Sequence, residues 1–162
     1  MSDTTIQPVY SKQNFPIVGI GASAGGHDAI KRLLRNVDLN SGMAYILVQH
    51  LSPTHDSLLV EQLTPETTLP IYQVEDNINI APNTIYILPA NKTLTTIDGV
   101  LRLTERDLAG TNMVIDVFFN SLAQVYTSFV RGVLLTGNGY DGTQGLKTIK
   151  EYGGITFVQN PD

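Results

Sequence analysis

Three side chains of the kinds used in nucleophilic catalysis lie at or after the ends of predicted strands of this sequence: Ser23, His50 and Asp141. A histidine can take the proton of a serine hydroxyl, and a carboxylate can hold that imidazole in its useful tautomer. Taken singly, each has an ordinary structural explanation, because serines cap helices, strand-end histidines are hydrogen-bonded and Asp-Gly forms turns. Their combination favours a serine hydrolase. The chain order Ser, His, Asp differs from the Ser, Asp, His order of α/β-hydrolases, so membership of that fold is not indicated.

The serine lies in the stretch FPIVGIGASAGG, Phe15 to Gly26, where an apolar run breaks into small residues. Such a run followed by helical spacing predicts a buried strand that turns sharply into a helix. Three interpretations of the turn remain open: the G-x-S-x-G nucleophile elbow, a phosphate-binding loop of the dinucleotide type, and a purely structural turn. A dinucleotide-binding site needs an acidic residue at the end of the second strand to bind the ribose. This chain has Gln49 and His50 there, so the sequence argues against a dinucleotide cofactor.

The other titratable candidates are weaker. We expect His27 to begin the first helix, exposed or capping, and His55 to lie in a loop five residues past His50. Asp116 is the main rival carboxylate, but near a helix N-terminus it can complement the helix dipole without a catalytic role. A metal site of His50, His55 and Asp141 lacks an i, i+4 histidine pair, so we expect no metal and no cofactor.

Strand-like and helix-like segments alternate along the chain. Apolar runs predict strands, and 3.6-residue periodicity predicts helices. Asp98-Gly99 between two short extended segments predicts a hairpin within Leu94 to Leu103. The expected strands are 16–20, 43–50, 69–74, 84–88, 131–136 and 155–159, and the expected helices are 27–37, 57–63, 113–126 and 143–153.

This order predicts an α/β fold with a doubly wound, mostly parallel sheet, Rossmann-like and three-layered, with an inserted β-hairpin. In such a fold the carboxyl ends of the strands carry the chemistry. Ser23 follows the first strand, His50 ends the second strand, and Asp141 lies in the loop after the strand 131–136. We expect a flexible arm over residues 1–14 and one catalytic domain over residues 15–162.

The composition and charge of the chain exclude several classes of protein. The chain has 162 residues, 42% of them hydrophobic, no cysteine and a formal charge of −5. Absent cysteines exclude disulfides and thiolate nucleophiles and fit a reducing cytosol. Only ten Lys and Arg, spread along the chain, predict no nucleic-acid binding. No apolar run approaches a membrane span, so we expect a cytoplasmic protein without membrane insertion.

Several segments together resemble a known family. GIGASAGG, VQHLSP, IYILPAN, VIDVFFNSLA and LTGNGYDGTQGLKTIKEYGG resemble the protein-glutamate methylesterase (CheB-type) catalytic domain of bacterial chemotaxis systems. The resemblance covers about Phe15 to Pro161 in order. It is strongest to the methylesterase portion that is fused ahead of a chemoreceptor methyltransferase.

The resemblance implies Ser23 as nucleophile, His50 as base and Asp141 as orienting carboxylate. It implies hydrolysis of glutamate γ-methyl esters on the cytoplasmic helices of methyl-accepting chemoreceptors, glutamine deamidation as a second reaction, and a fused or partner methyltransferase domain. Backbone amides of Ala24 and Asn138 are the candidate oxyanion donors. The alternative is a docking module for a receptor or partner that keeps the fold without turnover.

The sequence also departs from the family pattern. Ala24 stands where response-regulator-type members have threonine, and residues 112–115 lack their Arg-Pro-Ser run. We therefore expect no side-chain help to the oxyanion from position 24. We expect no receiver domain before the core within this chain, and we expect the chain to lack a C-terminal segment of the family domain.

Overall fold

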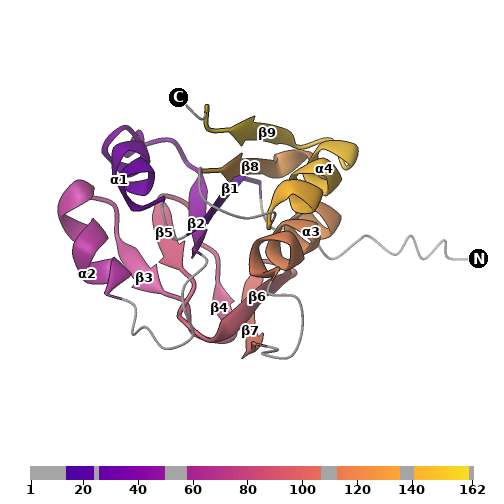
Figure 1. Ribbon diagram of the computed structural model, residues 1–162, viewed down its shortest axis with the longest axis horizontal. Coiled ribbons are helices and arrows are strands. Elements are labelled where there is room, and N and C mark those ends of the chain that lie inside the picture. The colour runs from indigo at the N-terminus through magenta and orange to yellow at the C-terminus, as the bar shows by residue number, and fades with distance from the viewer. Residues whose placement is uncertain (1–13, 24–25, 50–57, 107–112, 136–140, 161–162) are drawn as a thin grey trace, which may run out of the picture.

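A computed structural model describes residues 14–23, 26–49, 58–106, 113–135 and 141–160. Within them a six-stranded parallel sheet lies between two helical layers (Figure 1). The strand order is β3, β5, β2, β1, β8, β9, with β1 near the middle. The sheet contains β1 (Ile17–Ala22), β2 (Ala44–Gln49), β3 (Ile71–Gln73), β5 (Thr84–Ile87), β8 (Val130–Leu134) and β9 (Ile155–Val158). The predicted α/β class and three-layer arrangement are confirmed.

Four α-helices cover the two faces of the sheet. One layer holds α1 (His27–Arg35) and α2 (Leu59–Leu63), and the other holds α3 (Val114–Tyr126) and α4 (Thr143–Glu151), as Figure 1 shows. Short 3₁₀ turns follow α2 at Thr64–Glu66 and α3 at Thr127–Phe129. Within the described part of the chain no helix is long and apolar enough to cross a membrane.

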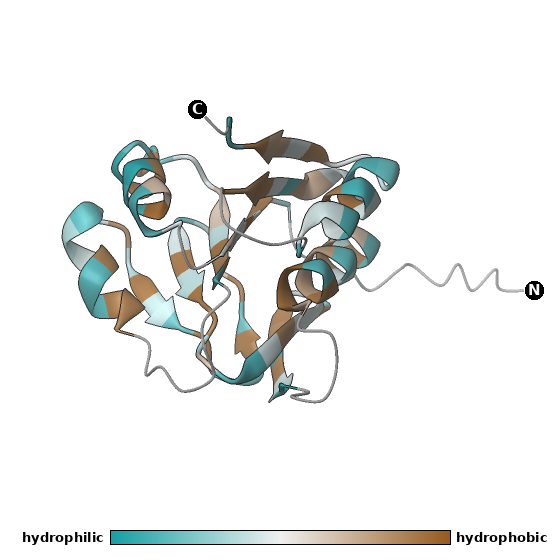
Figure 2. Cartoon of the chain, viewed as in Figure 1, coloured by the Kyte–Doolittle hydropathy of each residue, from teal (hydrophilic) through white to brown (hydrophobic). Residues whose placement is uncertain are grey.

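The central strands are apolar on both faces, which is why they read as continuous hydrophobic runs. Every residue of β1, β2 and β5 is buried, and the brown strands between partly teal helices in Figure 2 show this pattern. Side chains alternate between two cores, one under α1 and α2 and one under α3 and α4. On β1, Ile17 joins the α3 side, and Val18, Ile20 and Ala22 join the α1 side.

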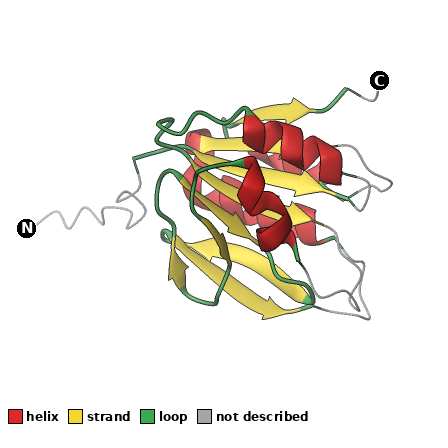
Figure 3. Ribbon diagram, turned by 90° about the vertical axis from the view of Figure 1, so that its left-hand side faces the viewer, coloured by secondary structure: helices red, strands yellow, loops and turns green. Residues whose placement is uncertain are grey.

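The predicted hairpin forms a second sheet of its own. It consists of β6 (Lys92–Ile97) and β7 (Val100–Glu105), and β4 (Ile78–Asn79) pairs antiparallel with β7. Figure 3 shows this small sheet apart from the parallel one. Asp98 and Gly99 both have positive φ, 49° and 81°, as the tight two-residue hairpin turn requires. The two-residue strand β4 was not predicted.

Helical periodicity predicts an apolar stripe on α3 that consists of Val114, Val117, Phe118, Leu122 and Val125. Val114, Phe118 and Leu122 are buried as predicted, but Val117 is exposed and Val125 is only partly buried. Ile115 and Phe119 are buried in addition, because α3 contacts the parallel sheet, α4 and β6. A helix with three neighbours needs a wider apolar face than a single stripe.

Candidate active site

The sheet changes direction of winding between β1 and β8. The connection after β1 passes through α1 on one face, and the connection after β8 passes through α4 on the other face. Open α/β sheets bind ligands at such a switch point, outside the carboxyl ends of the strands. Ser23 follows β1, and Asp141 lies in the connection between β8 and α4. The topology therefore brings these two predicted site residues to the edge where a site is expected.

Ser23 is not used as a helix cap. The N-cap residue of α1 is Gly26, and no side chain caps that helix. The Ser23 carbonyl accepts a hydrogen bond from the Gly26 N–H at 2.9 Å. The Ser23 hydroxyl itself is buried, and no hydrogen-bond partner for it is found in the described residues. A buried hydroxyl without a partner is costly, so its usual structural explanation does not hold here.

Strand alternation assigns a face to Ser23. Methyl groups built on Gly19 and Gly21 would meet side chains of α3, at 2.8 Å from Leu122 Cδ1 and 2.5 Å from Ile115 Cγ2. Because alternate strand residues share a face, continuing the alternation of β1 one residue past its end at Ala22 would give Ser23 the α3 side. Glycine at position 21 lets β1 pass directly over Ile115.

Asp141 binds the start of α3. Its Oδ2 accepts the Ile115 N–H at 2.9 Å, and its Oδ1 accepts the Asp116 N–H at 2.8 Å. The N-cap residue Met113 contributes no side-chain bond, so Asp141 supplies the cap from elsewhere in the chain. A carboxylate at a helix N-terminus is also favoured by the helix dipole. Asp141 is thus more than a residue of an Asp-Gly turn.

Both site segments contact the same side chain of α3. A methyl group on Gly142 would lie 3.1 Å from Ile115 Cγ2, close to where one on Gly21 would lie. The Ile115 N–H is the group bound to Asp141. The end of β1 and the start of α4 are therefore packed together on Ile115, and this links the surroundings of Ser23 to those of Asp141.

Asp116 lies in the first turn of α3, as predicted, and has a second role that was not predicted. It is 8% exposed, and its Oδ1 accepts the N–H groups of Gly142 at 3.0 Å and Gly145 at 2.7 Å. It therefore complements the N-terminus of α4 and not only that of its own helix, α3. Sequence reasoning missed this pairing. The available signal was an acidic residue between the apolar residues Ile115 and Val117.

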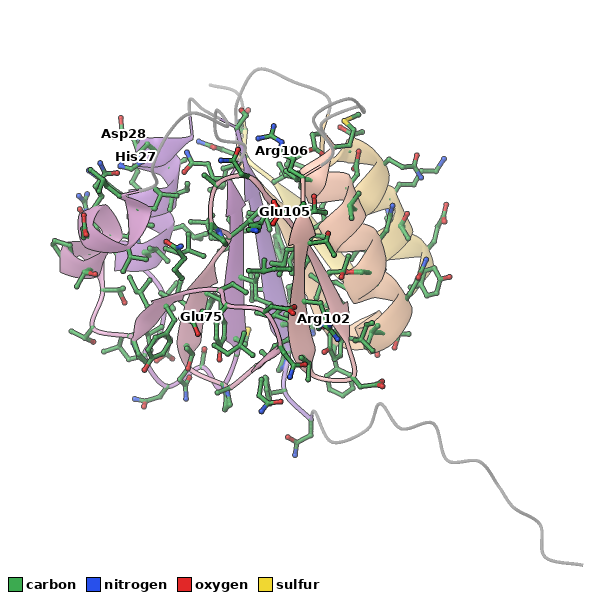
Figure 4. The ribbon with its side chains drawn as sticks, turned by 90° about the horizontal axis from the view of Figure 1, so that it is seen from below. His27, Asp28, Glu75, Arg102, Glu105 and Arg106 are labelled. Carbon is green, nitrogen blue, oxygen red and sulfur yellow. The ribbon has the colours of Figure 1, made fainter. Side chains whose placement is uncertain are left out.

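The other candidates are placed as follows. His27 is the first residue of α1 and is partly buried, without a capping bond to the helix. In Figure 4, His27 and Asp28 lie at the same end of the molecule as Arg106, which follows β7. His50, His55, Ala24 and Asn138 lie outside the described residues. Among the described residues no group of three His, Cys, Asp or Glu could hold a metal ion.

Gln49 is the last residue of β2 and pairs with Ala22 of β1. It is buried, and its Oε1 has no hydrogen-bond partner in the described part of the chain. Alternation places it on the α1 side, opposite to Ser23. It is not acidic, so the ribose-binding carboxylate of a dinucleotide site is absent from this position.

A family model described as CheB methylesterase matches residues 18–162. The chain belongs to this family. The crystal structure of the Thermotoga maritima CheB methylesterase catalytic domain matches with a TM-score of 0.78 and 29% identity, covering 89% of this chain and 79% of that one. The fold described above is therefore that of a CheB-type domain.

Two curated relatives show how much of a longer protein the chain spans. A Leptospira interrogans protein is 32% identical over 158 residues, which cover 91% of this chain and 78% of that protein. The protein-glutamate methylesterase/protein-glutamine glutaminase of Trichodesmium erythraeum is 32% identical over 149 residues, covering 89% of this chain but 42% of that protein. The chain thus spans less than half the length of the second relative.

Proposed function

We propose that this CheB-type domain is a protein-glutamate methylesterase that hydrolyses glutamate γ-methyl esters on the cytoplasmic helices of chemoreceptors. Ser23 is the nucleophile, His50 the base and Asp141 the orienting carboxylate. The observation that carries the proposal is the Ser23 hydroxyl, which is buried beside the switch point and caps no helix. The relatives' names supply the substrate class, and glutamine deamidation follows from the same names.

His50 is assigned from the strand register. The β1–β2 pairing runs in step from Ile17 and Ala44 to Ala22 and Gln49. In the sequence, Ser23 comes directly after Ala22, and His50 comes directly after Gln49. The carboxyl ends of neighbouring parallel strands lie at the same edge of the sheet, so the proposal has the imidazole beside the hydroxyl at that edge.

The reaction proceeds in two halves. The imidazole takes the Ser23 proton as the oxygen bonds to the ester carbon, and the tetrahedral intermediate then expels methoxide, which leaves as methanol with that proton. Water attacks the resulting glutamyl-serine ester in the same way and restores the hydroxyl. The balance is ester plus water giving carboxylic acid plus methanol. Backbone N–H groups of Ala24 and Asn138 are the proposed oxyanion donors.

The cellular setting belongs to the same proposal. Receptor glutamates that carry methyl groups lie on cytoplasmic helices, so the domain acts in the cytoplasm. The methyl esters must be made by a methyltransferase, which we propose as a partner or a fused domain. Neither a cofactor nor a metal is needed for this chemistry.

The test is methanol release from a chemoreceptor cytoplasmic fragment whose glutamates carry radiolabelled methyl esters. Ser23→Ala should reduce release to background, and His50→Gln should remove most of it, about 10²-fold or more. His55→Gln is the matched control and should keep nearly all activity. Equal rates for Ser23→Ala and the unchanged chain would refute the serine mechanism. Binding of the fragment without turnover would favour the docking module.

A further inference from the structure

Two helices of this domain are capped by each other's aspartate. In α3 the N2 and N3 amides, those of Ile115 and Asp116, donate to Asp141. In α4 the N-cap and N3 amides, those of Gly142 and Gly145, donate to Asp116. Neither N-cap residue, Met113 or Gly142, makes a side-chain capping bond of its own. Each carboxylate thus replaces the cap that the other helix lacks.

The cap of α4 must come from outside that helix. Gly142 has φ of 103°, a left-handed conformation that L side chains rarely adopt. A methyl group at this position would also lie 2.6 Å from Leu134 Cδ1. A serine or aspartate at position 142 is therefore excluded by both conformation and space. Asp116 supplies the missing acceptor from inside the protein.

We propose that Asp116 is a positioning residue for Asp141, and this rests on the proposed function of Asp141. Asp141 directly precedes Gly142, whose N–H is held by Asp116 Oδ1. Fixing Gly142 and the first turn of α4 fixes the peptide that carries the Asp141 side chain. Asp141 is then held against Ile115, in the orientation from which the proposed function has it accept the imidazole N–H.

The first consequence concerns the structure. In Asp116→Ala the Gly142 and Gly145 amides lose their acceptor, and the turn that carries Asp141 is released. The Ile115 amide, which donates to Asp141 and not to Asp116, should then lose protection from hydrogen exchange. Asp116→Asn keeps an oxygen at the same place and should preserve that protection.

The second consequence concerns catalysis. In Asp116→Ala, kcat for methyl-ester hydrolysis on the labelled receptor fragment should fall about 10- to 100-fold with KM little changed, because a positioning error of about 1 Å can cost that much. Asp116→Asn should recover most of the kcat. Tyr126→Phe is the control: it removes a buried hydroxyl at the other end of α3 and should lower stability without a comparable loss of kcat.

The experiment measures kcat, KM and Ile115 amide exchange for the 162-residue chain and these three variants. Loss of both Ile115 protection and kcat in Asp116→Ala, with recovery of both in Asp116→Asn, supports the positioning role. Unchanged kcat in Asp116→Ala, or a loss equal to that in Tyr126→Phe, overturns it while leaving the proposed function intact. If the unchanged chain hydrolyses no ester, the proposed function fails, and the catalytic role of Asp116 fails with it.

Discussion

At the scale of single residues, the two ends of α3 are held by different chemistry. Carboxylates meet backbone amides at its N-terminus. At its C-terminus the Tyr126 hydroxyl accepts the Gly99 N–H at 2.8 Å and lies 2.9 Å from Thr96 Oγ1. The hydroxyl group thereby joins α3 to the turn between β6 and β7. The charged bonds join α3 to the segment before α4, and the neutral bonds attach the small sheet.

Tyr126 gives stability a dependence on alkaline pH. Burial raises the pKa of Tyr126 above its ordinary value of 10.0, against the opposing effect of the bonds to Thr96 and Gly99. As pH rises past about 10, the unfolded chain loses the phenolic proton before the folded protein does, so stability falls from there up to the folded pKa. Tyr126→Phe should remove this part of the fall.

The measurement is the free energy of unfolding in urea from pH 8 to pH 11. At pH 8 Tyr126→Phe should cost about 1–2 kcal/mol for the lost hydrogen bonds, and the difference from the unchanged chain should shrink as pH rises. Tyr72→Phe, at an exposed tyrosine, is the control and should leave the slope unaltered. A constant difference for Tyr126→Phe would contradict the shifted pKa.

The position of Ser23 directly after β1 could be foreseen from the sequence because glycine spacing and an apolar run are local signals. The position of Asp141 between β8 and α4 could be foreseen for the same reason, whereas the catalytic roles of both residues stay predictions. The bonds from Asp116 to Gly142 and Gly145 could not be predicted, since they join residues 26 and 29 positions apart. Nothing local distinguishes an aspartate that caps its own helix from one that caps another. The arrangement of His50, Ala24 and Asn138 stays a prediction.

At the scale of elements, the close contact of α3 with α4 depends on a missing side chain. A methyl group on Gly145 would lie 2.5 Å from Phe119 Cβ and 3.2 Å from Asp116 Cα. Neither atom is the far end of a flexible side chain, so the helices would have to separate. Gly145 also donates to Asp116, and separation would stretch that bond.

Gly145→Ala should therefore destabilise the fold, although alanine is usually better than glycine in a helix by about 1 kcal/mol. Overpacking costs about 1–3 kcal/mol, which exceeds that gain, and activity should fall as the Asp116 contact is lost. Thermal unfolding and ester hydrolysis measure the two effects. Gln144→Ala, at the exposed neighbouring position, should be neutral or slightly stabilising. A rise in the melting temperature of Gly145→Ala would show that the helices adjust freely.

Most elements follow from periodicity and turn residues, but their partners do not. Asp98-Gly99 predicts the hairpin. The separation of the hairpin from the parallel sheet depends instead on its packing against α3 and its pairing with β4. Two-residue β4 is too short for an alternating pattern to be visible. Val117 is apolar and is predicted to be buried, yet it is exposed because the neighbours packed against α3 leave that side of the helix open.

At the scale of the whole molecule, the sheet has two different edges. On β9, which pairs only with β8 among the described strands, Phe157 is 54% exposed and Val158 is 68% exposed. Ile155 is exposed as well, so apolar side chains appear on both faces of this strand. On β3, at the other edge, Tyr72 is 53% exposed but Gln73 beside it is polar. An apolar strand at an open edge favours association with another chain.

Phe157→Lys should therefore reduce concentration-dependent self-association of the 162-residue chain while leaving its melting temperature nearly unchanged. The lysine replaces exposed apolar area with a charge that is unfavourable at a strand–strand contact, and little buried area is lost from the fold. Sedimentation velocity over a range of protein concentrations measures the effect. Tyr72→Lys is the matched control at the opposite edge and should change association less, because it interrupts no continuous apolar strand. Equal effects of the two substitutions would show that β9 contributes no more to self-association than β3 does. If the unchanged chain is monomeric at every concentration, the prediction is wrong.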